Sequence, residues 1–109
     1  MRVLLDTNII LDFFLSRAPH YEAAKRIFEL TCHGQLEAYT TSSSITDIYY
    51  IVAKKLGDRA AREVLRDLFS LLGIIAVDGD DCIYALELPI SDYEDAVVTI
   101  CAKKPRSIL

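Results

Sequence analysis

The residues best suited to chemistry in this sequence are three aspartates, Asp6, Asp47 and Asp95, which stand where predicted strands end or predicted helices begin. Carboxylates that are brought close together repel one another strongly unless a cation lies among them. Magnesium and manganese prefer carboxylate and water oxygens, and either ion would turn an acidic pocket into one that accepts phosphate. If the fold brings these aspartates together, the pattern favours metal-assisted hydrolysis of phosphodiester bonds.

The first aspartate lies in a polar turn between two apolar stretches. Asp6 follows the apolar run of residues 3–5, and it could simply close a strand and cap the helix that comes next. Thr7 and Asn8 are small polar residues at the same junction. They either cap the helix or orient Asp6 and a water molecule at the site.

The second aspartate also has a structural interpretation. Residues 44–47 (SITD) have the spacing of a capping box, in which Asp47 at the third helical position would reach back to the amide of the cap residue. Ser43, just before this box, could equally be a helix cap or a hydroxyl of the site. Both interpretations of Asp47 remain open at this point.

The third aspartate is harder to explain by structure alone. Residues 91–94 (SDYE) form another capping box, and we assign Glu94 to that role. Asp95 is then left over in the same first turn, directly before the apolar residues of its helix. Asp92 shares the helical face of Asp95 and either supports the site or only adds charge to the first turn. The metal interpretation is the one that accounts for all three aspartates.

The remaining polar and aromatic residues are interpreted as supporting, surface or core residues. Asp12 falls within the first predicted helix, and we interpret it as a solvated or supporting residue rather than a ligand. His20 and His33 flank the second helix without an acid or cysteine at ligand spacing, so we place both at the surface. The pair at residues 49–50, two tyrosines, could stack on a nucleic-acid base, although helical spacing puts one of them in the core.

The composition predicts one soluble cytoplasmic domain. The chain has 109 residues, and 16 acidic side chains exceed 12 basic ones, so any contact with nucleic acid must be local. No apolar run reaches the roughly 18 residues that span a bilayer. Cys32, Cys82 and Cys101 have no metal-binding or disulfide spacing, and we expect them to be buried thiols.

The hydrophobic periodicity predicts the strands and helices that would position these aspartates. Short apolar runs predict strands, and apolar residues at helical spacing predict two helices after each strand. Such alternation predicts a Rossmann-like, three-layer α/β/α domain with a parallel sheet, whose ligands lie beyond the carboxyl ends of the strands. We expect strands at 3–5, 36–40 and 74–77, and helices at 8–18, 21–33, 45–56, 58–72, 80–88 and 91–102.

Three segments together resemble the PIN domain family, in the branch of the bacterial VapC-type toxins: LLDTNIILDFF, SSITDIYYIVAKKLG and SDYEDAVVTICAKK. They occur in the family's order over nearly the whole chain. The resemblance implies a magnesium- or manganese-dependent ribonuclease, often a homodimer that an antitoxin protein inhibits. The family's acidic residues carry over onto Asp6, Asp47 and Asp95, with Thr7 or Asn8 beside them. At Asp47 many members have glutamate.

The sequence departs from the family after its last predicted helix. Members usually continue into another strand, a loop with a fourth acid and a last strand, whereas this sequence reads KKPRSIL. We therefore expect residues 1–109 to form a single PIN-like domain that is short at its C-terminus. The first strand would become an open edge, covered by a partner chain or by the tail.

The missing acid leaves a second functional hypothesis. The chain could be a catalytically impaired PIN-like module that acts in dimerisation or antitoxin binding. A phosphotransferase with Asp6 as its nucleophile fits less well, because the position two residues on is Asn8 rather than a second acid and no lysine stands in a suitable place.

Overall fold

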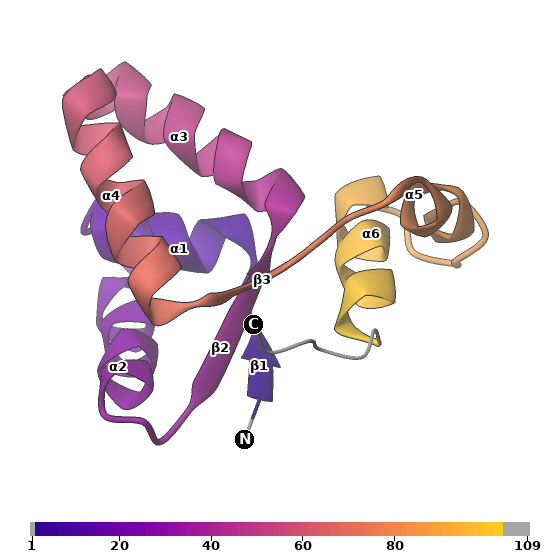
Figure 1. Ribbon diagram of the computed structural model, residues 1–109, viewed down its shortest axis with the longest axis horizontal. Helices are drawn as coiled ribbons and strands as arrows, with labels where there is room; N and C mark the ends of the chain where they lie inside the picture. The colour runs from indigo at the N-terminus through magenta and orange to yellow at the C-terminus, as the bar shows by residue number, and fades with distance from the viewer. Residues whose placement is uncertain (1, 104–109) are drawn as a thin grey trace.

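The computed structural model describes residues 2–103, and within them strands and helices alternate as expected (Figure 1). Each predicted element is present, with boundaries shifted by a few residues. In chain order the elements are β1 (Arg2–Leu4), α1 (Thr7–Phe14), α2 (Tyr21–Cys32), β2 (Glu37–Thr41), α3 (Ser42–Leu56), α4 (Asp58–Leu71), β3 (Gly73–Ile75), α5 (Gly79–Ala85) and α6 (Tyr93–Ala102).

The strands form one parallel sheet in the order β1-β2-β3. Leu4 pairs with Tyr39, and Thr41 pairs with Ile75, so the carboxyl ends of the strands meet at a common edge. The chain passes from β1 into α1 and from β2 into α3 at that edge. The sheet therefore brings two of the segments that contain predicted site residues close together.

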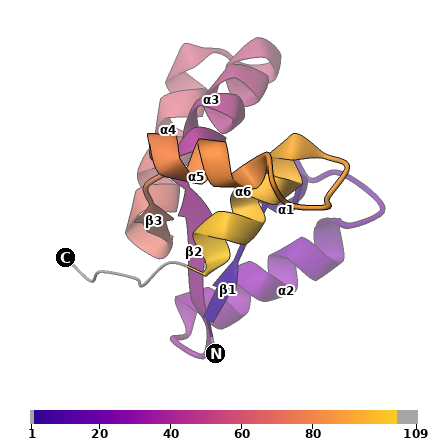
Figure 2. The same cartoon turned by 90° about the vertical axis from the view of Figure 1, so that its right-hand side faces the viewer.

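Helices cover both faces of the sheet, which confirms the three-layer prediction. Helices α1 to α4 lie on one side, whereas α5 and α6 lie on the other (Figures 1 and 2). Leu5 and Ala38 belong to the core under the first group of helices, while Leu4 and Tyr39 pack against the core under α5 and α6. Successive strand residues face opposite layers, and both layers are apolar, as in a buried parallel sheet.

The prediction that all cysteines are buried is wrong for two of them. Cys101 is fully buried in the core beneath α6, whereas Cys32 and Cys82 are exposed. Cys32 is the last residue of α2, and Cys82 lies on α5, where residues 82–84 are all exposed. Cys32 and Cys82 are therefore solvent-accessible thiols.

The first strand is an edge strand in the part of the chain that the structure describes. β1 pairs with β2 on one side, and no described strand pairs with its other side. The expected cover from the C-terminal tail involves residues 104–109, which lie outside the described residues. Within residues 2–103 no helix is both long and apolar enough to cross a bilayer.

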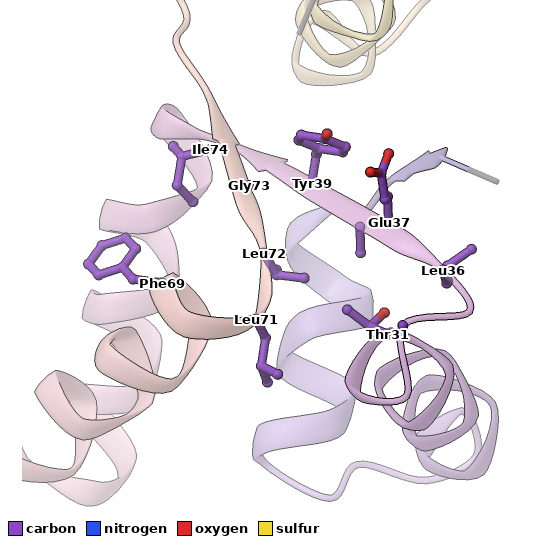
Figure 3. Close-up of a pocket in the computed structure, with 11 residues that line it drawn as sticks. Thr31, Leu36, Glu37, Tyr39, Phe69, Leu71, Leu72, Gly73 and Ile74 are labelled. Atoms are coloured by element: carbon purple, nitrogen blue, oxygen red, sulfur yellow. The ribbon is translucent and has the colours of Figure 1, made fainter. Parts of the chain in front are cut away.

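A wide cavity lies away from the predicted site residues, at the amino ends of β2 and β3 (Figure 3). It is an open groove of about 720 Å³ between the ring of Tyr39 and the side chains of Phe69 and Ile74. Its one acid, Glu37, forms an ion pair with Arg2 at 2.8 Å. The groove therefore offers no cluster of groups for chemistry.

Replacing Gly73 with alanine is expected to destabilise the sheet beside this groove. A Cβ at Gly73 would lie 2.5 Å from Cδ1 and Cε1 of Tyr39, so the ring or the strand must shift. Overpacking of this kind costs about 1–3 kcal/mol, which lowers the thermal midpoint by roughly 5–15 °C. Thermal unfolding followed by circular dichroism measures the change.

The matched control is Gly79→Ala. A Cβ at Gly79 would meet no other atom within 4 Å, and this residue is the first of α5, where alanine is a good helix former. Its midpoint should stay at or slightly above that of the wild type. Equal midpoints for Gly73→Ala and the wild type would show that Tyr39 can move aside at no cost.

Candidate active site

Asp6 caps α1 and stands at the carboxyl edge of the sheet. Its backbone is extended (φ −81°, ψ 170°), and its Oδ1 accepts a hydrogen bond of 2.9 Å from the amide of Ile9. The capping interpretation is therefore correct for Asp6. It does not use the whole side chain, because Oδ1 is the oxygen engaged in the cap and the residue remains exposed to solvent.

A chain of hydroxyl groups joins the starts of α1 and α3. Thr7 Oγ1 donates to Ser44 Oγ at 3.0 Å, and the hydroxyls of Ser44 and Thr41 are 3.1 Å apart. The Thr41 hydroxyl also lies 3.1 Å from that of Ser43. Thr41 and Ser44 are buried, so these bonds fix how the two segments lie against each other.

The capping interpretation of Asp47, one of the two that the sequence left open, is wrong. The N-cap of α3 is Thr41, whose Oγ1 accepts from the amide of Ser44 at 3.3 Å. Because α3 already begins at Ser42, Asp47 lies in its second turn and cannot reach the first free amides. Asp47 is exposed, and no hydrogen bond or ion pair holds its carboxylate among residues 2–103.

The capping assignment of Glu94 is also wrong. Asp92 caps α6 instead, with its Oδ1 accepting from the amide of Asp95 at 3.1 Å. The helix begins at Tyr93, so Glu94 and Asp95 both lie in its first turn, where the helix dipole favours negative charge. Asp92 thus caps the helix, and Glu94 has no capping role.

The acids from all three segments gather around Glu94. Burial raises the pKa of Glu94, and repulsion from Asp47, Asp92, Asp95 and Asp6 raises this pKa further. Among these four carboxylates, Asp47 raises the pKa of Glu94 most. Segments 41 to 48 residues apart in the sequence therefore contribute to one negatively charged region.

A shallow cavity of about 280 Å³ lies within this region. Thr7 and Asn8 from α1, Asp47 from α3 and Glu94 from α6 line it, together with the exposed side chains of residues 50–51. The described residues do not, however, contain a group of three or more His, Cys, Asp or Glu side chains placed to hold a metal ion directly. The carboxylates are close enough to repel one another, and their side chains are not set in a ligand geometry.

Arg17 contacts Asn8, which lines the cavity, and the sequence interpretation did not include it. Its Nε donates to Asp12 Oδ1 at 2.9 Å, and its Nη2 donates to the backbone oxygen of Asn8 at 3.1 Å and to Asn8 Oδ1 at 3.5 Å. Asp12 is therefore neutralised in an ion pair, consistent with a supporting role. His20 and His33 are exposed, as expected.

The fold and the acidic edge define a class of small α/β domains with carboxylates gathered at the carboxyl ends of parallel strands. A sequence profile of the PIN domain matches residues 2–106, so the chain belongs to the PIN domain family. This match confirms the resemblance carried by the three sequence segments.

Two relatives agree with the family. The chain is 25% identical over 108 residues to Ribonuclease VapC1 from Aquifex aeolicus (strain VF5), a match that covers 94% of this chain and 74% of that protein. It also resembles a crystal structure of VapBC2 from Rickettsia felis bound to a DNA fragment from its promoter. That similarity has a TM-score of 0.64 at 20% identity, covers 94% of this chain and 80% of the other, and supports the fold.

Replacing Glu94 with glutamine is expected to stabilise the protein, increasingly so as the pH rises. Because its pKa is raised in the folded state, the native protein binds this proton more tightly than the unfolded chain does. The stabilisation is present below the ordinary pKa of 4.5 and is lost as the pH rises through the raised value. Thermal midpoints across this range, with the exposed Glu63→Gln on α4 as control, measure the difference. A constant difference between Glu94→Gln and the wild type would contradict the shift.

Proposed function

We propose that this protein is a metal-dependent endoribonuclease that hydrolyses RNA phosphodiester bonds at the acidic site. The observation that carries the proposal is the cavity that Thr7 and Asn8 from α1, Asp47 from α3 and Glu94 from α6 line together, at the edge of the sheet where α1 and α3 begin. Structural capping explains Asp6 and Asp92, but it does not explain why Asp47, Glu94 and Asp95 should share one region.

The donor set suits magnesium or manganese. Asp6, Asp47 and Asp95 would hold the ion, since carboxylate oxygens are the ligands that hard divalent cations prefer. When bound, such an ion supplies positive charge that stabilises the phosphate in the transition state and activates water for attack. Its charge would also relieve the repulsion that raises the pKa of Glu94.

Neighbouring residues would support this centre. Thr7, Ser43 and Asn8 offer hydroxyl and amide groups at the edge of the site, and Asp92 holds the first turn of α6 through the amide of Asp95. Arg17 contacts the Asn8 side chain at 3.5 Å, while its own charge is paired with that of Asp12. These groups orient the substrate and the acids.

Incubation of purified protein with a labelled single-stranded RNA tests the proposal. Cleavage is expected with manganese or magnesium and should stop when EDTA removes the ion. A contaminating nuclease is excluded by running the Asp6→Asn protein, purified in the same way. Absence of cleavage by folded wild-type protein with either ion would contradict the proposal.

A second candidate function is a non-catalytic module that dimerises or binds an antitoxin protein. Two observations on residues 2–103 favour it: these residues hold no group of three side chains placed to bind a metal ion, and none of their strands pairs with the outer side of β1. The similar protein of known structure is VapBC2. In this proposal the chain forms a homodimer in the cytoplasm and binds an antitoxin protein. A monodisperse monomer in light scattering, alone and with a candidate antitoxin, would count against it.

A further inference from the structure

One face of α3 continues the acidic site toward the other end of the molecule. Asp47, Tyr50 and Lys54 are three and four residues apart, so they follow one another along the same side of the helix. All three are exposed, and Lys54 lies in the last turn of α3. The face thus runs from carboxylates through an aromatic ring to a positive charge.

Tyr50 lies where two hollows meet. Its side chain is 70% exposed and lines the 280 Å³ cavity at the acids. It also lines a mostly apolar groove of about 270 Å³ between α3 and α4, together with Tyr49, Arg62 and Leu65. One ring therefore borders both hollows, so a ligand that extends from the acidic cavity into the groove would pass over it.

The floor of the groove is held in place by a small polar network. The Tyr49 hydroxyl donates to Asp58, and Arg62 Nε donates to both carboxylate oxygens of Asp58 at 3.0 Å. The guanidinium also lies over the Tyr49 ring, 6.0 Å from its centre. The rings of Tyr49 and Tyr50 pack edge to face, with 5.5 Å between their centres. The exposed ring of Tyr50 therefore packs against a Tyr49 ring that the network holds in place.

The charge of the surrounding hairpin is opposite to that of the whole chain. Residues 42–71, which span α3 and α4, contain five Lys or Arg side chains and four acidic ones, a net charge of +1, whereas the whole chain has a net charge of −4. Local positive charge beside an aromatic ring is the usual composition of a surface that binds single-stranded nucleic acid. Figure 1 shows α3 and α4 side by side, with the start of α3 at the sheet edge.

We propose that Tyr50 and the α3–α4 groove bind a base of single-stranded RNA next to the phosphate at the acidic site, with Lys54 and Arg62 facing the RNA backbone. The proposal rests on the proposed function, because the acids mark where the reacting phosphate lies. A groove of about 270 Å³ is suited to one planar ring system rather than to a packed helix of a protein partner.

Fluorescence anisotropy with a labelled single-stranded RNA of about eight nucleotides tests this in EDTA, where no cleavage takes place. Tyr50→Ala should weaken binding about tenfold, which corresponds to ~1.4 kcal/mol for one lost stacking contact. Tyr50→Phe should bind within about twofold of the wild type, because its ring face also stacks. Tyr84→Ala, which removes a tyrosine 60% exposed on α5, is the matched control and should bind normally.

The salt dependence of RNA affinity distinguishes the contribution of the positive charges from that of the Tyr50 ring. Lys54→Gln should lower the slope of log affinity against log salt by about 0.7, the value for one phosphate contact on a single strand. Tyr50→Ala should leave that slope unchanged. Lys25→Gln, an exposed lysine on α2, should change neither affinity nor slope. A duplex of the same sequence should bind equally to Tyr50→Ala and the wild type, since its bases are already stacked.

Equal binding of single-stranded RNA by Tyr50→Ala and the wild type would overturn the proposal and leave the groove to a protein partner. Failure of the wild type to bind RNA would overturn it as well. The Asp6→Asn protein distinguishes this failure from that of the proposed function. If Asp6→Asn still cleaves RNA, the acidic site is wrongly assigned, while a Tyr50-dependent difference in binding would still establish the base site.

Discussion

Replacing Asp6 with asparagine is expected to reduce RNA cleavage by about a hundredfold or more without unfolding the protein. Asparagine caps helices as well as aspartate does, so the bond from the Ile9 amide is retained. The substitution removes the negative charge that a divalent cation needs, and a hundredfold loss corresponds to ~2.7 kcal/mol of transition-state stabilisation. Initial rates of cleavage with saturating manganese measure the effect.

Two further variants complete this experiment, one at the acidic site and one far from it. Asp47→Asn should lose activity to a similar degree, because its carboxylate has no hydrogen bond or ion pair to any described residue and its loss leaves the fold intact. Asp67→Asn changes an exposed acid on α4 and should cleave like the wild type. Full activity in Asp6→Asn and Asp47→Asn would remove both residues from the site.

Replacing Ile48 with alanine is expected to lower stability by about 2–5 kcal/mol. Ile48 directly follows Asp47, is 0% exposed and belongs to the core between α3 and its neighbours. Truncation leaves a cavity there, and a loss of this size lowers the thermal midpoint by ~10 °C or more. The same side chain thus fixes the position of the helix that carries Asp47 and Tyr50.

Ile51→Ala is the matched control for this prediction. It makes the same chemical change three residues later on α3, at a position that is 36% exposed. Its thermal midpoint should fall by much less, because little apolar surface is removed from the interior. Equal losses for the two variants would show that α3 is not held by its buried face.

The fold was accessible from the sequence because its signals are local. Apolar runs at 3–5 and 74–77 have no polar face, as expected for strands that are covered on both sides, and the intervening helices keep a regular apolar spacing. The alternation of strands and helices then restricts the topology to a parallel sheet. Both observed strand pairs are parallel, which confirms this prediction.

The helix caps were not accessible, because they depend on where each strand stops. Thr41 still pairs with Ile75 and then caps α3, so this helix begins earlier than its apolar pattern indicates. The same holds for α6, where Ser91 and Asp92 are both good capping residues. The choice of Asp92 depends on the path of the chain from α5, which no local pattern records.

The composition of the site was only partly predictable for related reasons. Glu94 was assigned to a cap by its spacing, and the structure places it among the acids instead. Arg17 follows the end of α1 and reaches back five residues to Asp12, outside the spacing that marks ion pairs within a helix. Contacts made across the end of a helix require the tertiary structure.

Calorimetric titration of manganese into the wild type and Asp47→Asn at neutral pH tests most directly whether the gathered carboxylates form a cation site. We expect saturable binding of about one ion per chain by the wild type and loss of that binding in the variant, with circular dichroism showing that both are folded. Absence of any binding heat from folded wild-type protein at millimolar manganese would contradict the metal site and favour the non-catalytic module.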